Sequence, residues 1–399
     1  MKNRLQKERV NKIKKTDREF IKELCDEINP YRICEIFDSK SKMYKEAKLI
    51  YFNLGKNPYF KSFKNKIMNG YSIIGVSDYE KSYIFDNKYD SKSERIICAS
   101  KTINLDLNVL TYLEKIVDNK KLEDQDRFIE YLKYIKKSGY NLNMSTSLLE
   151  RISKPIYKKI WYKYILSFIK YEVLDEITER NLIEDYLLTE DEYRRAKEIL
   201  DVSVYREEQE EQFYVVACLI SKAFLLKQDK IDKKIKLKKL LEYSLNRLNI
   251  YLEFELYLMF MYLMNDETVQ ETFSKIQNIS KKSLEKIGNI SWDILHIRLI
   301  EMQMISDLKG GQIVFHYIGT KDIGLQNIIN INPLKLIGFL DGQSIMVREK
   351  NIKDIFFDEQ MGVIFDKHIN KANIGTMNYK EIFTEISSEV EKLVNANMK

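Results

Sequence analysis

The spacing of hydrophobic positions divides this chain into stretches of two kinds. Short apolar runs between polar turns at 71–76, 82–85 and 95–98 predict strands or an irregular lead-in. From residue 101, strand-like runs alternate with segments of helical spacing, which favours a parallel sheet. The elements predicted in this stretch are strands at 101–106 and 140–144, helices at 109–117 and 127–137, and a helix that carries Glu150.

Only helical spacing is found from residue 154 to residue 285, where apolar residues recur at steps of three and four. This stretch is several times longer than an ordinary connection of about 2–6 residues in an α/β unit, so we interpret it as an insertion. Its most apolar window, 250–264, contains Glu253 and Glu255 and is too short to cross a bilayer. We expect a buried core helix there.

The alternating pattern returns at residue 286. Ser291 is placed to cap a helix that runs to about residue 305, and Gly310 and Gly311 are placed to end it. The elements predicted after it are strands at 312–318, 334–340 and 344–347, a short helix at 325–329 and a last helix at 379–394.

The sequence therefore predicts an α/β fold in which a large all-helical insertion interrupts a parallel sheet. Residues 1–66 are expected to form amphipathic helices, with a break where Asn29 precedes Pro30. The predicted regions are a basic helical N-terminal region and lead-in (1–100), the two halves of the α/β domain (101–153 and 286–348), the insertion between them (154–285) and a C-terminal extension (349–399).

The charge of the chain is unevenly distributed. The net charge is +6, but residues 1–66 alone hold 18 basic and 9 acidic residues. Such an arm suits nucleic acid, although a solvated charged helix has the same composition. The four cysteines show no spacing typical of zinc, and no apolar signal core is found at the N-terminus. We expect a cytoplasmic protein that does not enter a membrane.

Four acidic residues occupy comparable places in the predicted α/β domain. Asp106 ends the first strand, Glu150 lies in the helix after the second, Asp293 lies in the first turn of a helix, and Asp322 follows a later strand. Each also has a local explanation as a turn, surface or capping residue. Because ligands bind at the carboxyl ends of parallel strands, these acids are expected to converge. Oxygen ligands of this kind suit Mg²⁺ or Mn²⁺.

The local motifs resemble those of the PIN-like domain nucleases. The segment 104–110, Asn-Leu-Asp-Leu-Asn-Val-Leu, resembles the opening strand motif of that family, and 320–325, Thr-Lys-Asp-Ile-Gly-Leu, resembles its late strand end. The segments 147–151 and 291–296 are similar to its second and third acidic motifs. The resemblance covers about a quarter of the chain. It implies a Rossmann-like fold, a divalent metal and cleavage of RNA or, less often, DNA.

In that resemblance, Asp106, Glu150, Asp293 and Asp322 are both the catalytic residues and the metal ligands. Asn108 and Thr320 are the residues that orient them. The insertion and the 29 residues from Asp293 to Asp322 depart from a compact PIN domain, and they leave the third ligand open. The remaining site candidates are Asp307 as its substitute, Asp341 as an accessory acid, and His296, which is either a substrate contact or a satisfied buried histidine.

These features predict a metal-dependent endonuclease, with RNA as the first expected substrate, in a role such as a toxin or phage-defence effector. The helical insertion is then a surface for a protein partner or a second copy of the chain. The alternative is a helical interaction protein or nucleic-acid-binding protein whose α/β part has no catalytic activity. In that alternative, the basic arm is the nucleic-acid contact.

Overall fold

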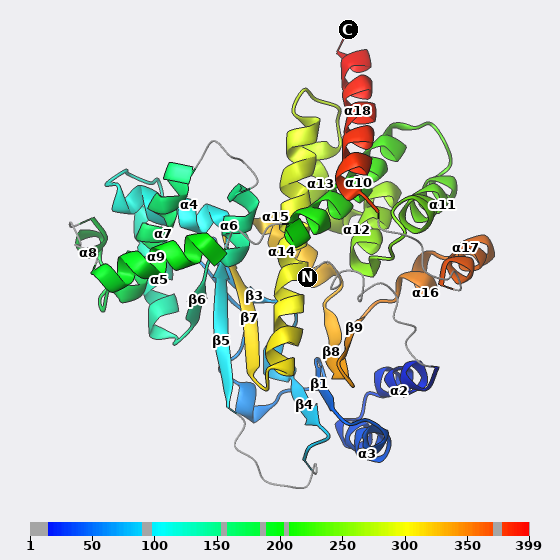
Figure 1. Ribbon diagram of the computed structural model, residues 1–399, viewed down its shortest axis with the longest axis horizontal. Coiled ribbons are helices and arrows are strands. Elements are labelled where there is room, and N and C mark those ends of the chain that lie inside the picture. The colour runs from blue at the N-terminus through cyan, green and yellow to red at the C-terminus, as the bar shows by residue number, and fades with distance from the viewer. Residues whose placement is uncertain are drawn as a thin grey trace.

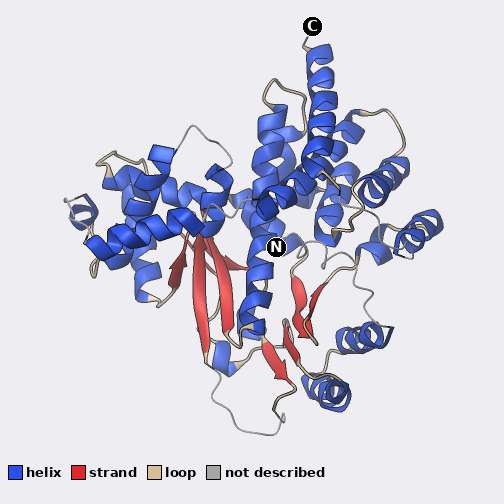
Figure 2. Cartoon of the chain, viewed as in Figure 1, coloured by secondary structure: helices blue, strands red, loops and turns tan. Residues whose placement is uncertain are grey.

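The described strands of the protein form two sheets, and most helices lie above and beside them (Figure 2). The described segments of this computed structural model are 15–89, 98–152, 158–183, 189–202, 207–369 and 377–398. The first 14 residues of the predicted basic arm lie outside these segments. Within them, no helix is both long and apolar enough to cross a membrane.

The larger sheet contains the parallel strands that the sequence predicts. Its strand order is β2-β3-β7-β5-β6, and β5 pairs in parallel with both β6 and β7. β3 pairs with β7 in the antiparallel direction, so the sheet is mixed. The carboxyl ends of β5, β6 and β7 therefore lie at one edge. The strands are β2 (Lys66–Met68), β3 (Tyr71–Gly75), β5 (Ala99–Leu105), β6 (Asn141–Asn143) and β7 (Ile313–Thr320).

Three helices begin at that edge, each directly after one of the parallel strands. They are α4 (Leu107–Val117) after β5, α6 (Ser145–Ile152) after β6 and α15 (Ile323–Ile331) after β7. α4 buries its apolar face, including Leu110 and Leu113, in the main core, and α5 (Gln125–Lys137) follows it. The α/β pattern predicted from residue 101 is thus confirmed, and three helix N-termini face one region.

The smaller sheet is antiparallel and brings distant parts of the chain together. Its order is β4-β1-β8-β9, and it contains the strands predicted at 82–85, 334–340 and 344–347. Phe20, Ile33 and Phe37 of the N-terminal helices pack against it in a second hydrophobic core. These elements are α2 (Lys15–Asp26), α3 (Pro30–Lys40), β1 (Ala47–Tyr51), β4 (Tyr83–Asp86), β8 (Leu334–Leu340) and β9 (Gln343–Arg348).

The sequence suggested that the N-terminal region is helical up to residue 66, but its described part contains a strand as well as helices. The break before Pro30 is confirmed, since α2 ends at Asp26 and α3 begins at Pro30. The expectation of helix up to residue 66 is wrong, because β1 at 47–51 pairs with both β4 and β8. Both strands that pair with β1 come from later parts of the chain, so the short sequence of β1 does not indicate these pairings.

The long helix α14 (Ser283–Lys309) runs through the centre of the molecule and packs against β7 and β8 (Figure 1). The predicted start of this helix at Ser291 is wrong. The Ser291 hydroxyl donates to the carbonyl of Ile287, 2.7 Å away, as serines inside helices do. Asp293 consequently lies roughly three turns inside α14 instead of in its first turn. The predicted stop at Gly310 is confirmed.

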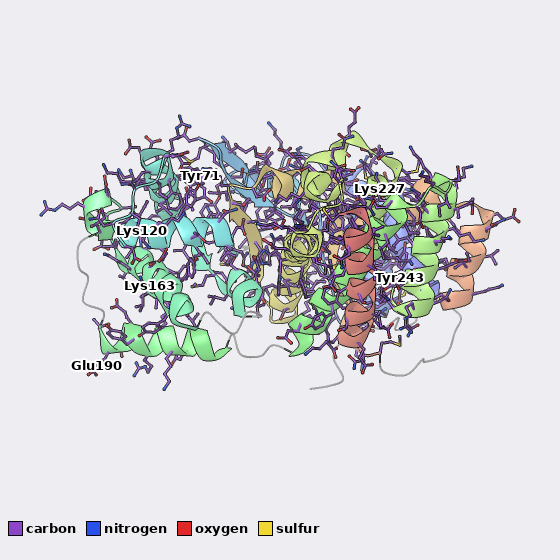
Figure 3. The ribbon with its side chains drawn as sticks, turned by 90° about the horizontal axis from the view of Figure 1, so that it is seen from above. Tyr71, Lys120, Lys163, Glu190, Lys227 and Tyr243 are labelled. Carbon is purple, nitrogen blue, oxygen red and sulfur yellow. The ribbon has the colours of Figure 1, made fainter. Side chains whose placement is uncertain are left out.

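The helices of the insertion form two groups on either side of α14 (Figures 1 and 3). One group packs on α4 and contains Lys163, and the other packs on α14 and α18 and contains Tyr243. The helix predicted within 250–264 is confirmed as α12, which is buried from Phe254 to Leu263. The helices are α7 (Lys158–Val173), α8 (Glu179–Ile183), α9 (Glu190–Val202), α10 (Glu207–Gln228), α11 (Lys233–Glu242), α12 (Glu253–Met264) and α13 (Gln270–Phe273).

The C-terminal extension is helical in its described part. The last helix, predicted at 379–394, is confirmed as α18 and packs against α10. The remaining elements are α16 (Ile352–Phe356), α17 (Glu359–Ile369), α18 (Tyr379–Asn397), the π-helical turn η5 (Tyr243–Arg247), and the 3-10 turns η1 (Ser41–Met43), η2 (Pro58–Phe60), η3 (Tyr79–Lys81), η6 (Glu267–Val269) and η7 (Ser274–Ile276).

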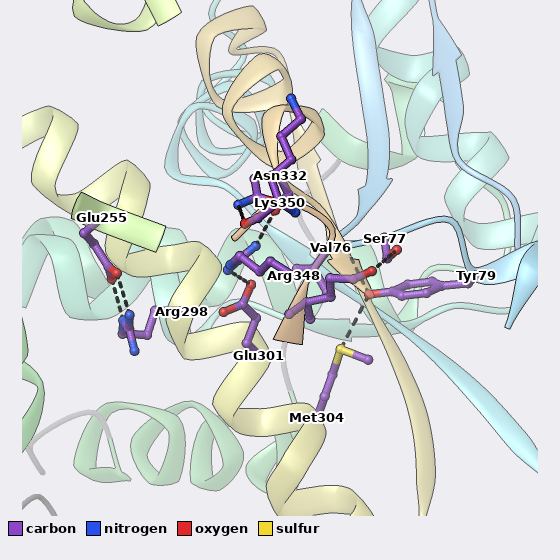
Figure 4. A network of polar contacts seen from close by, with 11 residues as sticks. Val76, Ser77, Tyr79, Glu255, Arg298, Glu301, Met304, Asn332, Arg348 and Lys350 are labelled. Atoms are coloured by element: carbon purple, nitrogen blue, oxygen red, sulfur yellow. Dashed lines mark hydrogen bonds and ion pairs between the residues drawn. The ribbon is translucent and has the colours of Figure 1, made fainter. Parts of the chain in front are cut away.

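Two buried ion pairs hold α14 to its neighbours (Figure 4). Arg298 donates to both carboxylate oxygens of Glu255 on α12, at 2.5 Å each. One turn further along α14, Glu301 pairs with Arg348 of β9. The Arg348 guanidinium also donates to the Asn332 carbonyl at 2.7 Å and stacks 3.7 Å from the ring centroid of Phe254. α14 therefore joins the insertion to the smaller sheet.

Candidate functional site

Asp106 lies at the edge of the larger sheet where β5 passes into α4. Its backbone N–H still donates to the Gly319 carbonyl of β7, and its side chain caps α4 by accepting from the Leu107 N–H at 2.6 Å. The other carboxylate oxygen accepts from the Asn108 amide at 2.6 Å and from the Thr320 hydroxyl at 2.7 Å. The carboxylate is thus fixed in position and is 8% exposed.

The two loops that carry the predicted first and last motifs are tied to each other. Asn108 bridges them: its amide nitrogen lies 3.3 Å from the Thr320 hydroxyl, and its oxygen accepts from the Lys321 N–H at 3.3 Å. Thr320 in turn accepts from the Asp322 N–H at 2.9 Å. Asp322 caps α15 through the Leu325 N–H at 3.1 Å. Asn108 and Thr320 therefore fix the position of Asp106 relative to Asp322. Residues that orient metal ligands make contacts of this kind.

Asp293 reaches the same region from α14. It is half-buried, and within the described part of the chain no residue donates a hydrogen bond to its carboxyl group. Burial raises the pKa of Asp293 well above the usual aspartate value. The carboxylates of Asp106, Asp322 and Glu150 raise that pKa further, while Lys275 opposes them. The four predicted acids thus interact electrostatically, with Asp293 as their common neighbour.

His296 and Glu150 approach the cluster from the interface of α14 with α6. The His296 ring is buried, and its Nε2 donates to the Thr146 carbonyl at the start of α6, 3.0 Å away. Burial lowers the pKa of His296, and the nearby Asp106 carboxylate opposes that shift. Glu150 is half-buried on α6. Of the two alternatives for His296, the structure thus shows a buried histidine with a hydrogen-bond partner. Its ring also lies near Asp106.

Burial also raises the pKa of Asp106, and the Asp322 carboxylate adds to this effect. The His296 ring and the hydrogen bonds from Thr320 and Leu107 act in the opposite direction. Two members of the cluster, Asp106 and Asp293, thus have raised pKa values. Groups shifted by burial and by specific charged neighbours are more frequent at functional sites than elsewhere.

Asp307 and Asp341 do not join this cluster. Asp307 lies 14 residues beyond Asp293 on α14, which is about 21 Å along the helix axis. Its carboxylate pairs with His316 of β7 at 2.6 Å. Asp341 occupies the tight turn between β8 and β9 and accepts from the N–H groups of Lys45 and Glu46 at 2.7 and 3.1 Å. Both carboxylates therefore accept hydrogen bonds from residues outside the acidic cluster.

The residues present partly fit a divalent cation. Within the described segments, no three His, Cys, Asp or Glu side chains lie close enough to hold a metal ion as they stand. The donor chemistry nevertheless suits one: a carboxylate offers about four lone-pair positions, and three hydrogen bonds leave Asp106 with one, on Oδ1. Asp293 accepts no hydrogen bond from the described residues. The cluster is therefore an open set of oxygen donors.

Sequence patterns did not point to Lys275, which belongs to η7 in the helical insertion. Its ammonium group lies 3.8 Å from the Asp322 carboxylate and lowers the pKa of Asp293. Ser147 was also missed: its hydroxyl donates to the Leu105 carbonyl at 2.6 Å and fastens α6 to the end of β5. Both contacts join segments far apart in sequence, so no local motif marks them.

Comparison with known proteins gives no match: no family model, no curated protein and no solved structure is significantly similar to this chain.

The shifted pKa of Asp293 predicts how pH changes the stability of the metal-free protein. An acid whose folded pKa is raised holds its proton more tightly when folded, so stability falls as pH rises from the unfolded pKa, about 3.9, through the folded one. Asp293→Asn removes this loss. We expect the melting temperature of Asp293→Asn in EDTA to rise relative to the wild type between pH 4 and pH 8.

The matched control is Glu285→Gln, an exposed acid in the first turn of the same helix, for which no such rise with pH is expected. An Asp293→Asn curve that stays parallel to the wild-type curve from pH 4 to pH 8 would contradict the electrostatic coupling.

Proposed function

We propose that the protein is a divalent-metal-dependent endonuclease of the PIN-like type, with RNA as its first substrate and DNA as the second. The observation that carries this proposal is that the carboxylates of Asp106, Asp322 and Glu150, from the ends of β5 and β7 and from α6, all act on the Asp293 carboxyl group in the middle of α14. Support comes from the Asp106–Asn108–Thr320–Asp322 hydrogen bonds, which link the two motifs with the clearest resemblance to that family.

Repulsion among the four acids favours a bound cation. Carboxylates that gather without a counter-charge repel one another, and this opposes their closer approach. Mg²⁺ or Mn²⁺, when bound, supplies the compensating charge and activates a water for attack on a phosphodiester. Asp106, Asp293 and Asp322 are the proposed ligands, with Glu150 as the fourth acid. Asn108 and Thr320 keep the Asp106 carboxylate oriented.

Positively charged and partly positive groups near the four acids are suited to a phosphate. Three helix N-termini, those of α4, α6 and α15, face the region and favour an anionic phosphate there. Lys275 adds a cation beside Asp322 on the side of the insertion. An acidic centre with Lys275 and helix N-termini at its margin has groups for a metal ion and for a phosphate side by side.

The test is cleavage of labelled single-stranded RNA and DNA with Mn²⁺ or with EDTA. The wild type is expected to cleave RNA only with Mn²⁺, and Asp322→Asn is expected to lower the rate at least about tenfold, because removing even an orienting partner of a ligand typically costs about 10–100-fold. The matched control is Asp341→Asn, since Asn keeps the oxygen that accepts from Lys45 and Glu46.

Activity that is equal in Asp322→Asn and Asp341→Asn, or absent from the wild type under all these conditions, would reject the proposal. The second outcome favours the non-catalytic interaction protein instead. In that case Mn²⁺ is expected to leave the melting temperature of the wild type unchanged.

A further inference from the structure

A chain of hydrogen-bonded side chains crosses the larger sheet from α6 to α14. The Ser145 hydroxyl at the start of α6 donates to the Asn143 oxygen at 2.5 Å, and the Asn143 amide donates to the Asn104 oxygen at 2.8 Å. The Asn104 amide nitrogen lies 3.4 Å from Nδ1 of His316, and Nε2 of that ring lies 2.6 Å from the Asp307 carboxylate. We call these five side chains, from Ser145 to Asp307, the polar chain.

The middle of the polar chain is buried inside the sheet. Its strands β6, β5 and β7 are neighbours, and Asn143 lies directly opposite Asn104 in the parallel register (Figure 1). Asn104 and His316 are each 3% exposed. A buried polar group without a partner costs roughly 1–3 kcal/mol, so each member of the chain restricts where its neighbours can lie. A buried network in which every member has a partner therefore favours a single arrangement.

The direction of the polar chain is fixed at both ends. The Asn143 oxygen also accepts from the Ser145 backbone N–H at 3.0 Å, and an N–H can only donate. The Asn104 NH₂ group also donates to the Tyr317 carbonyl at 3.0 Å, and a carbonyl can only accept. Nδ1 of His316 is consequently the acceptor for Asn104, and the ring carries its proton on Nε2, toward the carboxylate. All the links run in one direction, so they strengthen one another.

The polar chain and one further hydrogen bond join α6 to α14 at two places. Thr146, the second residue of α6, accepts from His296 of α14 through its carbonyl at 3.0 Å. Asp307, at the other end of the polar chain, lies 11 residues further along α14, which is about 17 Å along its axis. Glu150 belongs to α6, and Asp293 lies one turn before His296. The two helices are thus held at two separated points, and each of them carries an acid of the cluster.

We propose that Asp307, His316 and Asn104 are positioning residues of the acidic cluster, which act by holding α6 in one place against α14. The inference rests on the proposed nuclease function and concerns residues that act on its centre without touching a metal or a substrate. The polar chain sets where Glu150 lies relative to Asp293, because these two acids belong to the two helices that it joins. Asp307 thereby has a role in the centre, although it is not a ligand.

The test compares two substitutions of His316 in the full-length protein. Gln offers an oxygen that accepts from Asn104 and an NH₂ group that donates to Asp307, so His316→Gln keeps the polar chain, whereas His316→Leu breaks it. His316→Leu is expected to speed hydrogen exchange of the backbone amides in 145–152 in EDTA. It is also expected to lower the Mn²⁺ affinity, measured by electron paramagnetic resonance, about tenfold, the lower end of the range for groups that orient a ligand. His316→Gln is expected to resemble the wild type in both measurements.

A second variant separates the polar chain from the local cap of α6. Asn143→Asp keeps the oxygen that accepts from Ser145 but loses the NH₂ group that donates to Asn104. It is expected to speed exchange in 145–152 as well. The matched control is Asn87→Asp beside the smaller sheet, where a half-buried asparagine likewise accepts from one backbone N–H and donates to backbone carbonyls. The control is expected to lower the melting temperature without a change in that exchange.

The ¹⁵N spectrum of the wild type is expected to show His316 protonated at Nε2 and not at Nδ1. A proton on Nδ1, or equal exchange and equal Mn²⁺ affinity in His316→Leu and His316→Gln, overturns the inference. If His316→Leu does not fold, exchange in Asn143→Asp decides, and exchange equal to that of the wild type overturns the inference. Faster exchange without any Mn²⁺-dependent cleavage by the wild type supports the hold on α6 and rejects the nuclease proposal. Cleavage that needs Asp106 but is equal in the two His316 variants does the reverse.

Discussion

Asp106→Asn is expected to abolish Mn²⁺-dependent cleavage, with a loss of at least about 100-fold. Among the four acids, Asp106 is held most firmly in place, by hydrogen bonds from Leu107, Asn108 and Thr320. Its negative charge would bind the cation directly. Removing only an orienting partner of a ligand costs about 10–100-fold, so removing the charge of the ligand itself costs at least the upper value. Single-turnover cleavage of labelled RNA measures the loss.

The fold is expected to survive this change. Asn keeps an oxygen for the Leu107 N–H, so α4 keeps its cap. Burial already raises the pKa of Asp106, so the loss of its charge is tolerated, although the new NH₂ group faces the Asn108 amide and the Thr320 hydroxyl that donate to Oδ2 and lowers the stability in part. The control is Asp118→Asn at the other end of α4, where the carboxylate pairs with Lys120 and Lys163 at the surface. If Asp106→Asn keeps more than half of the activity of Asp118→Asn, the account of the centre fails.

The second large effect is expected on stability, from Arg348→Met. Glu301 is 2% exposed and pairs with Arg348, so the variant leaves a buried carboxylate without its counter-charge (Figure 4). Breaking one side of a buried pair costs roughly 3–5 kcal/mol. Burial raises the pKa of Glu301 and Arg348 opposes that shift, so protonation is easier in the variant and the deficit is expected to shrink as pH falls. Urea unfolding at pH 5 and pH 8 measures both effects.

Two further variants isolate the cause of that loss. The double variant Arg348→Met/Glu301→Gln removes both charges and is expected to recover more than half of the lost free energy of unfolding. Arg194→Met breaks an exposed pair with Asp191 and is expected to cost less than about 1 kcal/mol. A deficit in Arg348→Met as small as that of Arg194→Met would show that the buried pair does not hold α14 to β9.

Local patterns predicted the parts of the site that depend on local chemistry. Asp106 and Asp322 each follow a strand and cap a helix, so the change of hydrophobic period marked both positions. The parallel pairing of β5 with β7 then follows from the alternation of strands and helices, in spite of the long insertion between them. Glu150 lies in the helix after β6, as the same reasoning predicted, toward the C-terminal end of that helix.

Long-range pairing accounts for most of what the sequence did not reveal. β1 is a strand because β8, almost 290 residues later, pairs with it, and its own sequence is short and mixed. Ser291 resembles a cap, but a serine inside a helix satisfies its hydroxyl with the carbonyl four residues earlier. Asp293 therefore joins the cluster from the middle of α14, and Lys275 joins it from the helical insertion. Neither contact is visible in a local sequence pattern.

The most direct test of the metal centre is a crystal structure of the full chain grown with Mn²⁺, with anomalous scattering recorded at the manganese edge. The account predicts an anomalous peak bonded to carboxylate oxygens of Asp106 and Asp322, at the roughly 2.0–2.2 Å typical of small divalent cations, with Asp293 or Glu150 completing the protein ligands. A well-ordered cluster without a peak, or a manganese site only at other carboxylates, would contradict the account.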